Sequence, residues 1–273
     1  MIRSVKDKVV IITGASSGIG RALAFECAAR GARVTLAARS LDKLNEVAQE
    51  LAAAKHEVLI VRADVSLEED CKAIIRKTVE RFGRIDILIN NAGISMRASF
   101  TDVSLDVIRS LIDVNFWGTV YCTKYAIPYL LESKGSVTGV SSIAGFVGLP
   151  GRTGYSASKF ALKGFLDTIR TEYLKKDIHV LLACPGFTAS NIRNTALGAD
   201  GTQQGESPRD EGAMMTSEEV ARRIVNAIEK RKRTLILTAQ GKLTVLLSKL
   251  LPSLTDKIVY DHMSKEPGAP FVK

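Results

Sequence analysis

The chain has 273 residues, of which 46% are hydrophobic and 25% are charged, as in ordinary globular proteins and unlike disordered chains. A chain this long buries enough surface to fold without a metal or disulfide staple. Its four cysteines (27, 71, 122 and 184) form no CxxC pair, which argues against a zinc site and a disulfide framework, so no metal is expected. The first residues lack the pattern of a signal peptide, and a reducing cytoplasm is the expected location.

The formal net charge of +9 raises the question of nucleic-acid binding. Lys and Arg are spread along the whole chain, however, and the one dense run, KRKR at residues 230–233, is typical of a solvated helix end. We therefore expect no nucleic-acid partner. A basic surface would also attract phosphorylated small molecules.

Short β-branched apolar runs alternate with longer amphipathic segments along the chain. The predicted strands are 9–13, 33–38, 57–62, 85–90, 136–141, 178–184 and 234–238. The predicted helices are 18–30, 41–53, 67–82, 104–131, 154–174 and 217–230, with Gly31 as a helix stop and residues 216–219 as a capping box. This alternation predicts one α/β, doubly wound Rossmann-type domain over residues 1–273, with a seven-stranded parallel sheet and helices on both faces.

Two segments fall outside this alternation. Residues 191–215 form a long polar stretch with several glycines, which is typical of a lid or substrate loop. The extension 241–273 carries leucines near helical spacing, with lysines among them, and its apolar stretches are too short to span a bilayer. We expect the extension to cover a pocket or pack on a partner subunit. Peripheral contact with a membrane surface is the less favoured alternative.

The segment TGASSGIG, residues 13–20, follows the first strand and leads into a helix. Glycines in such a turn let backbone N–H groups approach a pyrophosphate, and the helix N-terminus adds partial positive charge. The spacing departs from the G-x-G-x-x-G fingerprint, and a merely flexible turn is the alternative. Other polar or glycine residues also follow predicted strands: 38–39, 64–65, 90–93, 141–142 and 185–186. All of them would lie on one rim of the sheet, where doubly wound folds bind ligands.

These residues resemble the short-chain dehydrogenase/reductase family. Its T-G-x-x-x-G-x-G turn matches residues 13–20, its N-N-A-G matches 90–93 and its Y-x-x-x-K matches 155–159, within a similarity over about residues 6–240. The resemblance implies that Asp64 and Val65 hold the adenine and that Ile19 lies near the pyrophosphate–nicotinamide half. The expected cofactor contacts are Gly14, Ser16, Ser17, Gly18, Ile19, Gly20, Arg39, Asp64, Val65, Asn91, Ala92, Gly93, Tyr155, Lys159, Pro185, Gly186, Thr188 and Ser190.

Charge at the end of the second strand indicates which dinucleotide binds. Enzymes that use NAD need an acidic group there for the ribose 2′-hydroxyl, and this chain has Ala38. The next residue, Arg39, can pair a 2′-phosphate, so NADP(H) is the expected cofactor. The family's NADP enzymes often add a second basic residue where this chain has Ser17. A solvated Arg39 is the alternative.

Tyr155 and Lys159 are four residues apart on a predicted helix and share a face. A free tyrosine has a pKa of ~10 and is a poor acid or base at neutral pH, and a neighbouring ammonium favours the phenolate. We expect this pair to transfer the proton, although such pairs usually lie inert on exposed helix faces. The resemblance implies that Ser142 hydrogen-bonds the substrate oxygen, with Ser141 as the structural competitor because strand alternation lets only one point inward.

Asn115 lies inside an otherwise apolar predicted helix, where an amide is unfavourable. The resemblance implies that it kinks the helix and holds a water on the proton path to Lys159; a surface asparagine is the alternative. The family also has a threonine at the place of Ser190, where a serine hydroxyl can make the same hydrogen bond to the nicotinamide carboxamide. Thr188 takes the backbone-contacting place.

The function expected from these residues is NADP(H)-dependent interconversion of a ketone or aldehyde and an alcohol. The apolar extension resembles that of the family's steroid and lipid ketone reductases, which favours a bulky hydrophobic substrate. The alternatives are a 3-oxoacyl-carrier-protein reductase, whose branch typically ends soon after its last strand, and a non-catalytic NADP(H)-binding sensor. Family members commonly pair through the helices at 104–131 and 154–174, so a homodimer or homotetramer is expected.

Overall fold

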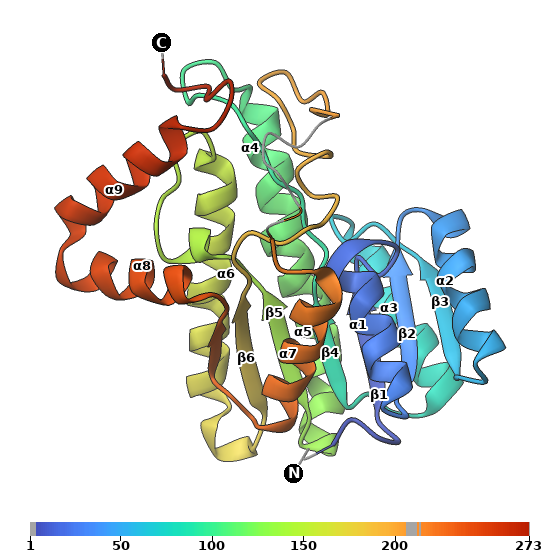
Figure 1. Cartoon of the computed structure of the whole chain (residues 1–273). Coiled ribbons are helices and arrows are strands. Elements are labelled where there is room, and N and C mark those ends of the chain that lie inside the picture. The colour runs from blue at the N-terminus through green and yellow to red at the C-terminus, as the bar shows by residue number, and fades with distance from the viewer. Residues whose placement is uncertain (1–3, 206–211, 213, 273) are drawn as a thin grey trace.

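The computed structural model describes residues 4–205, 212 and 214–272. Seven strands form one sheet in the order β3-β2-β1-β4-β5-β6-β7, and every pairing is parallel (Figure 1). The strands are β1 Val9–Thr13, β2 Arg33–Ala38, β3 Val58–Arg62, β4 Ile87–Asn90, β5 Ser136–Val140, β6 His179–Cys184 and β7 Thr234–Ile236. The predicted doubly wound α/β fold is confirmed, with strand ends that differ from the predicted ones by up to two residues.

Helices cover both faces of the sheet. They are α1 Gly18–Ala29, α2 Leu41–Ala53, α3 Glu68–Phe82, α4 Leu105–Ile112, α5 Gly118–Ser133, α6 Thr153–Glu172, α7 Ser217–Glu229, α8 Ala239–Leu250 and α9 Pro252–Ser264. Buried side chains of α1, α2 and α7 form one core, and those of α3, α5 and α6 form the other. Successive residues of β1 alternate between the two, since Val10 and Ile12 face the first core and Ile11 faces the second.

Gly31 and Thr216 mark the helix ends that the sequence predicts. Gly31 has a φ of +82°, a left-handed conformation that favours glycine, directly after α1. The Thr216 hydroxyl accepts the backbone N–H of Glu219 at 3.2 Å, so it caps α7. These contacts fix where the helices meet the loops that carry the site.

The continuous helix predicted over residues 104–131 is wrong. Helix α4 ends at Ile112, a π-helical turn spans Asp113–Trp117, and α5 begins at Gly118. The interruption falls at Asn115, where the resemblance implied a kink. Asn115 lies within the turn and is 1% exposed, which excludes the alternative of a surface asparagine.

The extension after β7 consists of α8 and α9, which project together from the body at the left of Figure 1. Val259 and Met263 of α9 pack on Val147, close to the end of β5. The two helices and the residue between them expose six large aliphatic side chains, each 47–67% accessible: Leu243, Leu246, Leu250, Leu251, Leu254 and Ile258. Of the helices in the described ranges, none combines the length and the hydropathy needed to cross a bilayer. The predicted loop 191–215 lies partly outside the described residues.

Candidate active site

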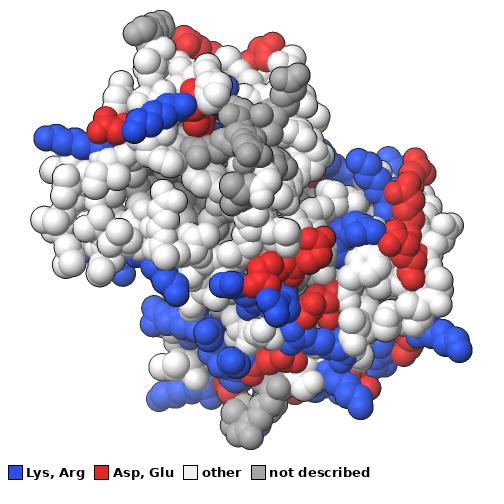
Figure 2. Space-filling view, in the orientation of Figure 1, with Lys and Arg blue, Asp and Glu red and all other residues white. Residues whose placement is uncertain are grey.

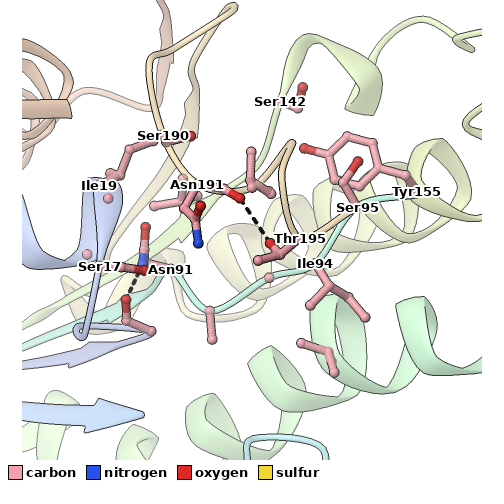
Figure 3. Close-up of a pocket in the computed structure, with 18 of the residues that line it drawn as sticks. Ser17, Ile19, Asn91, Ile94, Ser95, Ser142, Tyr155, Ser190, Asn191 and Thr195 are labelled. Carbon is pink, nitrogen blue, oxygen red and sulfur yellow. Dashed lines mark hydrogen bonds between the residues drawn. The ribbon is translucent and has the colours of Figure 1, made fainter. Parts of the chain in front are cut away.

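A pocket of about 730 Å³ opens beyond the carboxyl ends of the strands, where the strand order reverses between β1 and β4. Every residue expected to contact the cofactor lines it, and so does Ser142. Asn115 does not line the pocket and lies behind its wall. Figure 3 shows the arrangement, with the glycine turn at one end and Tyr155 at the other.

The glycine turn leaves no room for side chains at two positions. A Cβ on Gly20 would lie 2.0 Å from the Gly14 carbonyl oxygen, and a Cβ on Gly14 would lie 2.8 Å from Cα of Ala92. The Ser17 side chain does not cap α1, and the first turn of that helix contains no acidic residue. The arrangement is therefore suited to an anionic group at the N-terminus of α1.

Thr13 and Asn91 connect the glycine turn to the end of β4. The Thr13 hydroxyl accepts the backbone N–H groups of Asn91 and Ala92, each at 3.0 Å. The Asn91 side-chain amide donates to the carbonyl oxygens of Thr13 at 3.0 Å and Gly14 at 3.3 Å. Asn91 thus holds the turn in place, and Thr13, the first residue of the matched glycine motif, connects the turn to β4 from outside the pocket lining.

Arg39 and Asp64 line the end of the pocket beyond β2 and β3. The Arg39 side chain is 68% exposed, and its Nη1 lies 3.9 Å from Oδ2 of Asp64. Oδ1 of Asp64 accepts both the backbone N–H and the hydroxyl of Ser66, at 3.0 and 2.7 Å. Val65 contacts α5 so closely that a Cβ on Gly118 would lie 2.8 Å from its Cγ2. Arg39 is free to turn toward a phosphate, whereas Asp64 is held by its own loop.

The loop after β6 closes over the start of α1. The Thr188 hydroxyl donates to the Gly186 carbonyl at 3.2 Å, and the Arg193 guanidinium donates to the Thr188 carbonyl at 2.7 Å. The Ser190 Cβ would lie 3.4 Å from a Cβ on Gly18. Glycine at position 18 therefore lets the two loops approach each other.

Both serines after β5 border the pocket, and Ser142 is the more open of them. The Ser142 hydroxyl accepts the backbone N–H of Ala144 at 3.2 Å, at the start of a short 3₁₀ turn. Ser141 is 5% exposed, and its oxygen would lie 2.7 Å from a Cβ on Gly145. Ser142 and the Tyr155 hydroxyl lie close to one another in Figure 3.

Tyr155 and Lys159 share a face of α6, but their pKa values differ from the sequence-based expectation. Burial raises the pKa of Tyr155, opposed in part by a hydrogen bond with Ser142 and by the charge of Arg152. The Lys159 Nζ donates to the Val140 carbonyl at 3.0 Å and lies 5.6 Å from the centre of the Tyr155 ring. Burial lowers the pKa of Lys159 to about 8. Burial is therefore the largest influence on the pKa of Tyr155, and it opposes the lowering expected from Lys159.

Asn115 holds the loop after β4 from behind. Its Oδ1 accepts the backbone N–H of Ile94 at 2.8 Å, and its Nδ2 donates to the Ile94 carbonyl at 3.0 Å and the Ser158 hydroxyl at 2.9 Å. A Cβ on Gly93 would lie 3.0 Å from Asn115 Oδ1 and 3.4 Å from Lys159 Nζ. The π-helical turn therefore directs the amide into the wall between β4 and α6.

The end of the pocket near Tyr155 is lined by residues that the sequence analysis did not single out: Ile94, Ser95, Leu149, Arg152, Phe187, Thr195 and Leu197. Most are apolar, and several come from loops, whose positions the sequence pattern does not predict. Arg152 could have been suspected from the sequence, since it lies three positions before Tyr155, just before the predicted helix. Across residues 4–205, 212 and 214–272, His, Cys, Asp and Glu side chains form no group of three or more that could hold a metal ion.

Comparison with known proteins identifies the family. Residues 8–199 match the family model described as short chain dehydrogenase. The chain is 39% identical over 252 residues to "11-beta-hydroxysteroid dehydrogenase-like 4A" of Arabidopsis thaliana, covering 92% of this chain and 83% of the relative. It is 34% identical over 268 residues to "Dehydrogenase/reductase SDR family member 7B" of Mus musculus, covering 96% of this chain and 83% of the relative.

Solved structures agree in fold. A short chain dehydrogenase/reductase from Burkholderia phymatum in complex with NAD has a TM-score of 0.83 at 24% identity, covering 92% of this chain and 96% of that one. An alcohol dehydrogenase from the archaeon Thermococcus sibiricus complexed with 5-hydroxy-NADP has a TM-score of 0.75 at 28% identity, covering 84% and 95%. The chain belongs to the short-chain dehydrogenase family of oxidoreductases.

Proposed function

We propose that the protein interconverts a ketone or aldehyde and an alcohol with NADP(H) as cofactor. The observation that carries this proposal is that Ser142, Tyr155 and Lys159 line the same pocket as the glycine turn. A dinucleotide bound at the turn would extend toward the tyrosine. A sensor that only binds the cofactor would not need these three side chains together, which counts against that alternative.

The residues present fit a dinucleotide. At Gly14 and Gly20 a Cβ would clash with backbone atoms, so the turn can approach a pyrophosphate only because both are glycine. Arg39 is exposed at the rim of the pocket, where its guanidinium can pair a 2′-phosphate. Among related structures both NAD and an NADP derivative are found, so the preference for NADP(H) rests on Arg39 and on Ala38 beside it.

Arg39→Ala is expected to raise the KM for NADPH by about 10- to 100-fold while changing the KM for NADH little. A hydrogen bond to a charged group contributes about 1.5–3 kcal/mol, and each 1.4 kcal/mol corresponds to about a factor of ten. Steady-state kinetics with each cofactor measure the ratio. An unchanged KM for NADPH would refute this assignment of Arg39.

When bound, NADP(H) would supply a hydride in reduction and accept one in oxidation through its nicotinamide. Tyr155 donates its phenolic proton to the substrate oxygen in reduction and accepts a proton in oxidation. Ser142, whose hydroxyl lies beside that of Tyr155, stabilises the developing negative charge on the same oxygen. Lys159 has a pKa of about 8 and is mostly protonated at neutral pH, so it supplies positive charge near the phenol and a donor for the cofactor ribose.

We propose a bulky hydrophobic carbonyl or alcohol, lipid-like or steroid-like, as the substrate. Ile94, Leu149, Phe187 and Leu197 make much of the wall near Tyr155 apolar. Several relatives are named 11-beta-hydroxysteroid dehydrogenase-like proteins. A 3-oxoacyl-carrier-protein reductase is less favoured because α8 and α9 extend the chain well past β7.

Turnover of a panel of ketones with NADPH, and of alcohols with NADP⁺, tests the proposal. Steroid and lipid ketones are expected to give the highest kcat/KM, above short aliphatic ketones and a 3-oxoacyl thioester. Preference for the thioester would favour the carrier-protein reductase. Tight NADPH binding without turnover of any substrate would favour the sensor.

Helices α8 and α9 expose several large apolar side chains. Their surface is largely uncharged in Figure 2, whereas Lys, Arg, Asp and Glu are interspersed over most of the body on that face. We propose that the extension mainly borders the substrate pocket, because His262 of α9 lies 6.2 Å, ring to ring, from Phe187 in the pocket wall. Contact with a membrane surface is the minor alternative.

We further propose a homodimer or homotetramer in a reducing compartment such as the cytoplasm. Trp117 and Phe160 are 42% and 46% exposed where the π-helical turn and α6 face outward, and exposed aromatic side chains are typical of interfaces. All four cysteines are buried free thiols, which suits a reducing environment. Light scattering on the purified protein would give the number of subunits.

A further inference from the structure

Glu266, which follows α9, is 5% exposed. A buried carboxylate is costly unless cations pair with it. The Arg152 Nη2 lies 3.2 Å from its Oε2 and 3.5 Å from its Oε1, and the Arg97 Nε lies 3.7 Å from its Oε2. The two arginines come from different places, the loop after β4 and the start of α6. Glu266 therefore links the C-terminal segment to two parts of the body.

The rest of this segment contacts the same region. The Arg97 guanidinium donates to the carbonyl of Pro267. A Cβ on Gly151 would lie 2.9 Å from Pro270 and 3.4 Å from Phe271. Figure 1 shows the C-terminal coil beside the loop that precedes α4. Residues 266–271 therefore pack against the N-terminus of α6.

Arg152 brings this network to the active site. It is 8% exposed, directly precedes α6 and lines the pocket together with Ser142 and Tyr155. It lies three positions before Tyr155, at the N-cap of the helix whose first turn carries Tyr155. Its positive charge opposes the effect of burial on the pKa of Tyr155.

We propose that Glu266 is a positioning residue for the proton-transfer site, which holds the Arg152 guanidinium against the pocket wall beside Tyr155. The C-terminal segment then contributes to the geometry of the active site through Arg152. This inference rests on the proposed role of Tyr155 as the group that exchanges a proton with the substrate.

The charged and titratable groups around Tyr155 limit what can change its ionisation. Arg152 directly precedes its helix, Lys159 lies on that helix, Ser142 follows β5, and Cys184 ends β6. Burial raises the pKa of the Cys184 thiol to about 12, so Cys184 is neutral over the working range. Lys159 is left intact in every variant below.

Glu266→Gln keeps the shape of the side chain and removes its negative charge. The positive charge of Arg152 then acts on Tyr155 with less compensation and favours the phenolate. Alcohol oxidation requires Tyr155 as a base, so its rate rises with pH through the pKa of Tyr155. We expect this rise to move to lower pH by about half to one pH unit. Arg152→Gln is expected to move this rise to higher pH. Arg152→Lys keeps the positive charge and is expected to bring the rise back close to its wild-type pH.

The experiment compares pH profiles of kcat/KM for the three variants and the wild type. Glu229→Gln is the matched control, because Glu229 pairs with Arg30 at 2.7 Å on the side of the molecule formed by α1 and α7. The second readout is the ultraviolet absorbance of tyrosinate in the protein without cofactor, taken as the difference between each protein and its Tyr155→Phe form.

The inference is supported if the pH profile shifts in opposite directions in Glu266→Gln and Arg152→Gln and does not shift in Glu229→Gln. A purely structural loss would lower kcat without shifting the pH profile. Unmoved profiles and unmoved tyrosinate titrations in both variants overturn it. If the wild type turned over no substrate, the proposed function would fail, and the absorbance titration would still decide the role of Glu266.

Discussion

Tyr155→Phe is expected to lower kcat by about a hundredfold to ten-thousandfold, the usual contribution of a positioned general acid or base. Phenylalanine keeps the ring that packs beside the apolar cluster of Met96 and Leu111 and lacks the hydroxyl beside Ser142. The proton must then come from a less well placed donor. Steady-state kinetics with the best ketone measure kcat, and fluorescence titration measures the Kd for NADPH, which is expected to change little.

Tyr125→Phe is the matched control for this substitution. Tyr125 lies on α5 and donates its hydroxyl proton to Glu68 on the surface, outside the pocket. Loss of that hydroxyl is expected to leave kcat unchanged. Near-normal turnover by Tyr155→Phe, with both variants folded, would contradict the proposed mechanism.

Much of the fold follows from local sequence pattern. The runs that became β1, β4 and β6 hold several apolar residues in succession because both faces of these strands are covered, and that pattern is visible in the sequence. Gly31 and Thr216 likewise mark helix ends by their own chemistry. The π-helical turn at Asp113–Trp117 does not follow from local pattern, and only the family resemblance pointed to an irregular helix at Asn115.

The site divides in the same way. Residues that follow strands, such as the glycine turn and Ser142, were expected on one rim because the ends of parallel strands must meet there. Arg152 and Glu266 are separated by more than a hundred residues in the chain, and nothing local indicates that they pair. The direction of the pKa shift of Tyr155 could not be predicted from the sequence either, because it depends mainly on how deeply the side chain is buried. Helical spacing predicted only that Lys159 would be near.

Asn115→Leu is expected to lower the free energy of unfolding by about 2–5 kcal/mol. Leucine has a similar size but would leave the backbone N–H and carbonyl of Ile94 without their partners, and each buried unsatisfied group costs about 1–3 kcal/mol. Ser158 is less affected, since its hydroxyl also donates to the Tyr155 carbonyl at 2.7 Å. Urea denaturation followed by circular dichroism measures the difference.

Asn45→Leu serves as its control, because Asn45 is exposed on α2 and its replacement is expected to change stability by less than about 0.5 kcal/mol. The comparison also separates two roles for Asn115. If the amide serves only to hold a water for proton transfer, kcat falls while the free energy of unfolding stays unchanged. If it holds the loop after β4, both fall, because Gly93 and Ile94 lose the contact that sets their distance from Lys159. Asn115 bonds both the backbone N–H and the carbonyl of Ile94, which favours the second outcome.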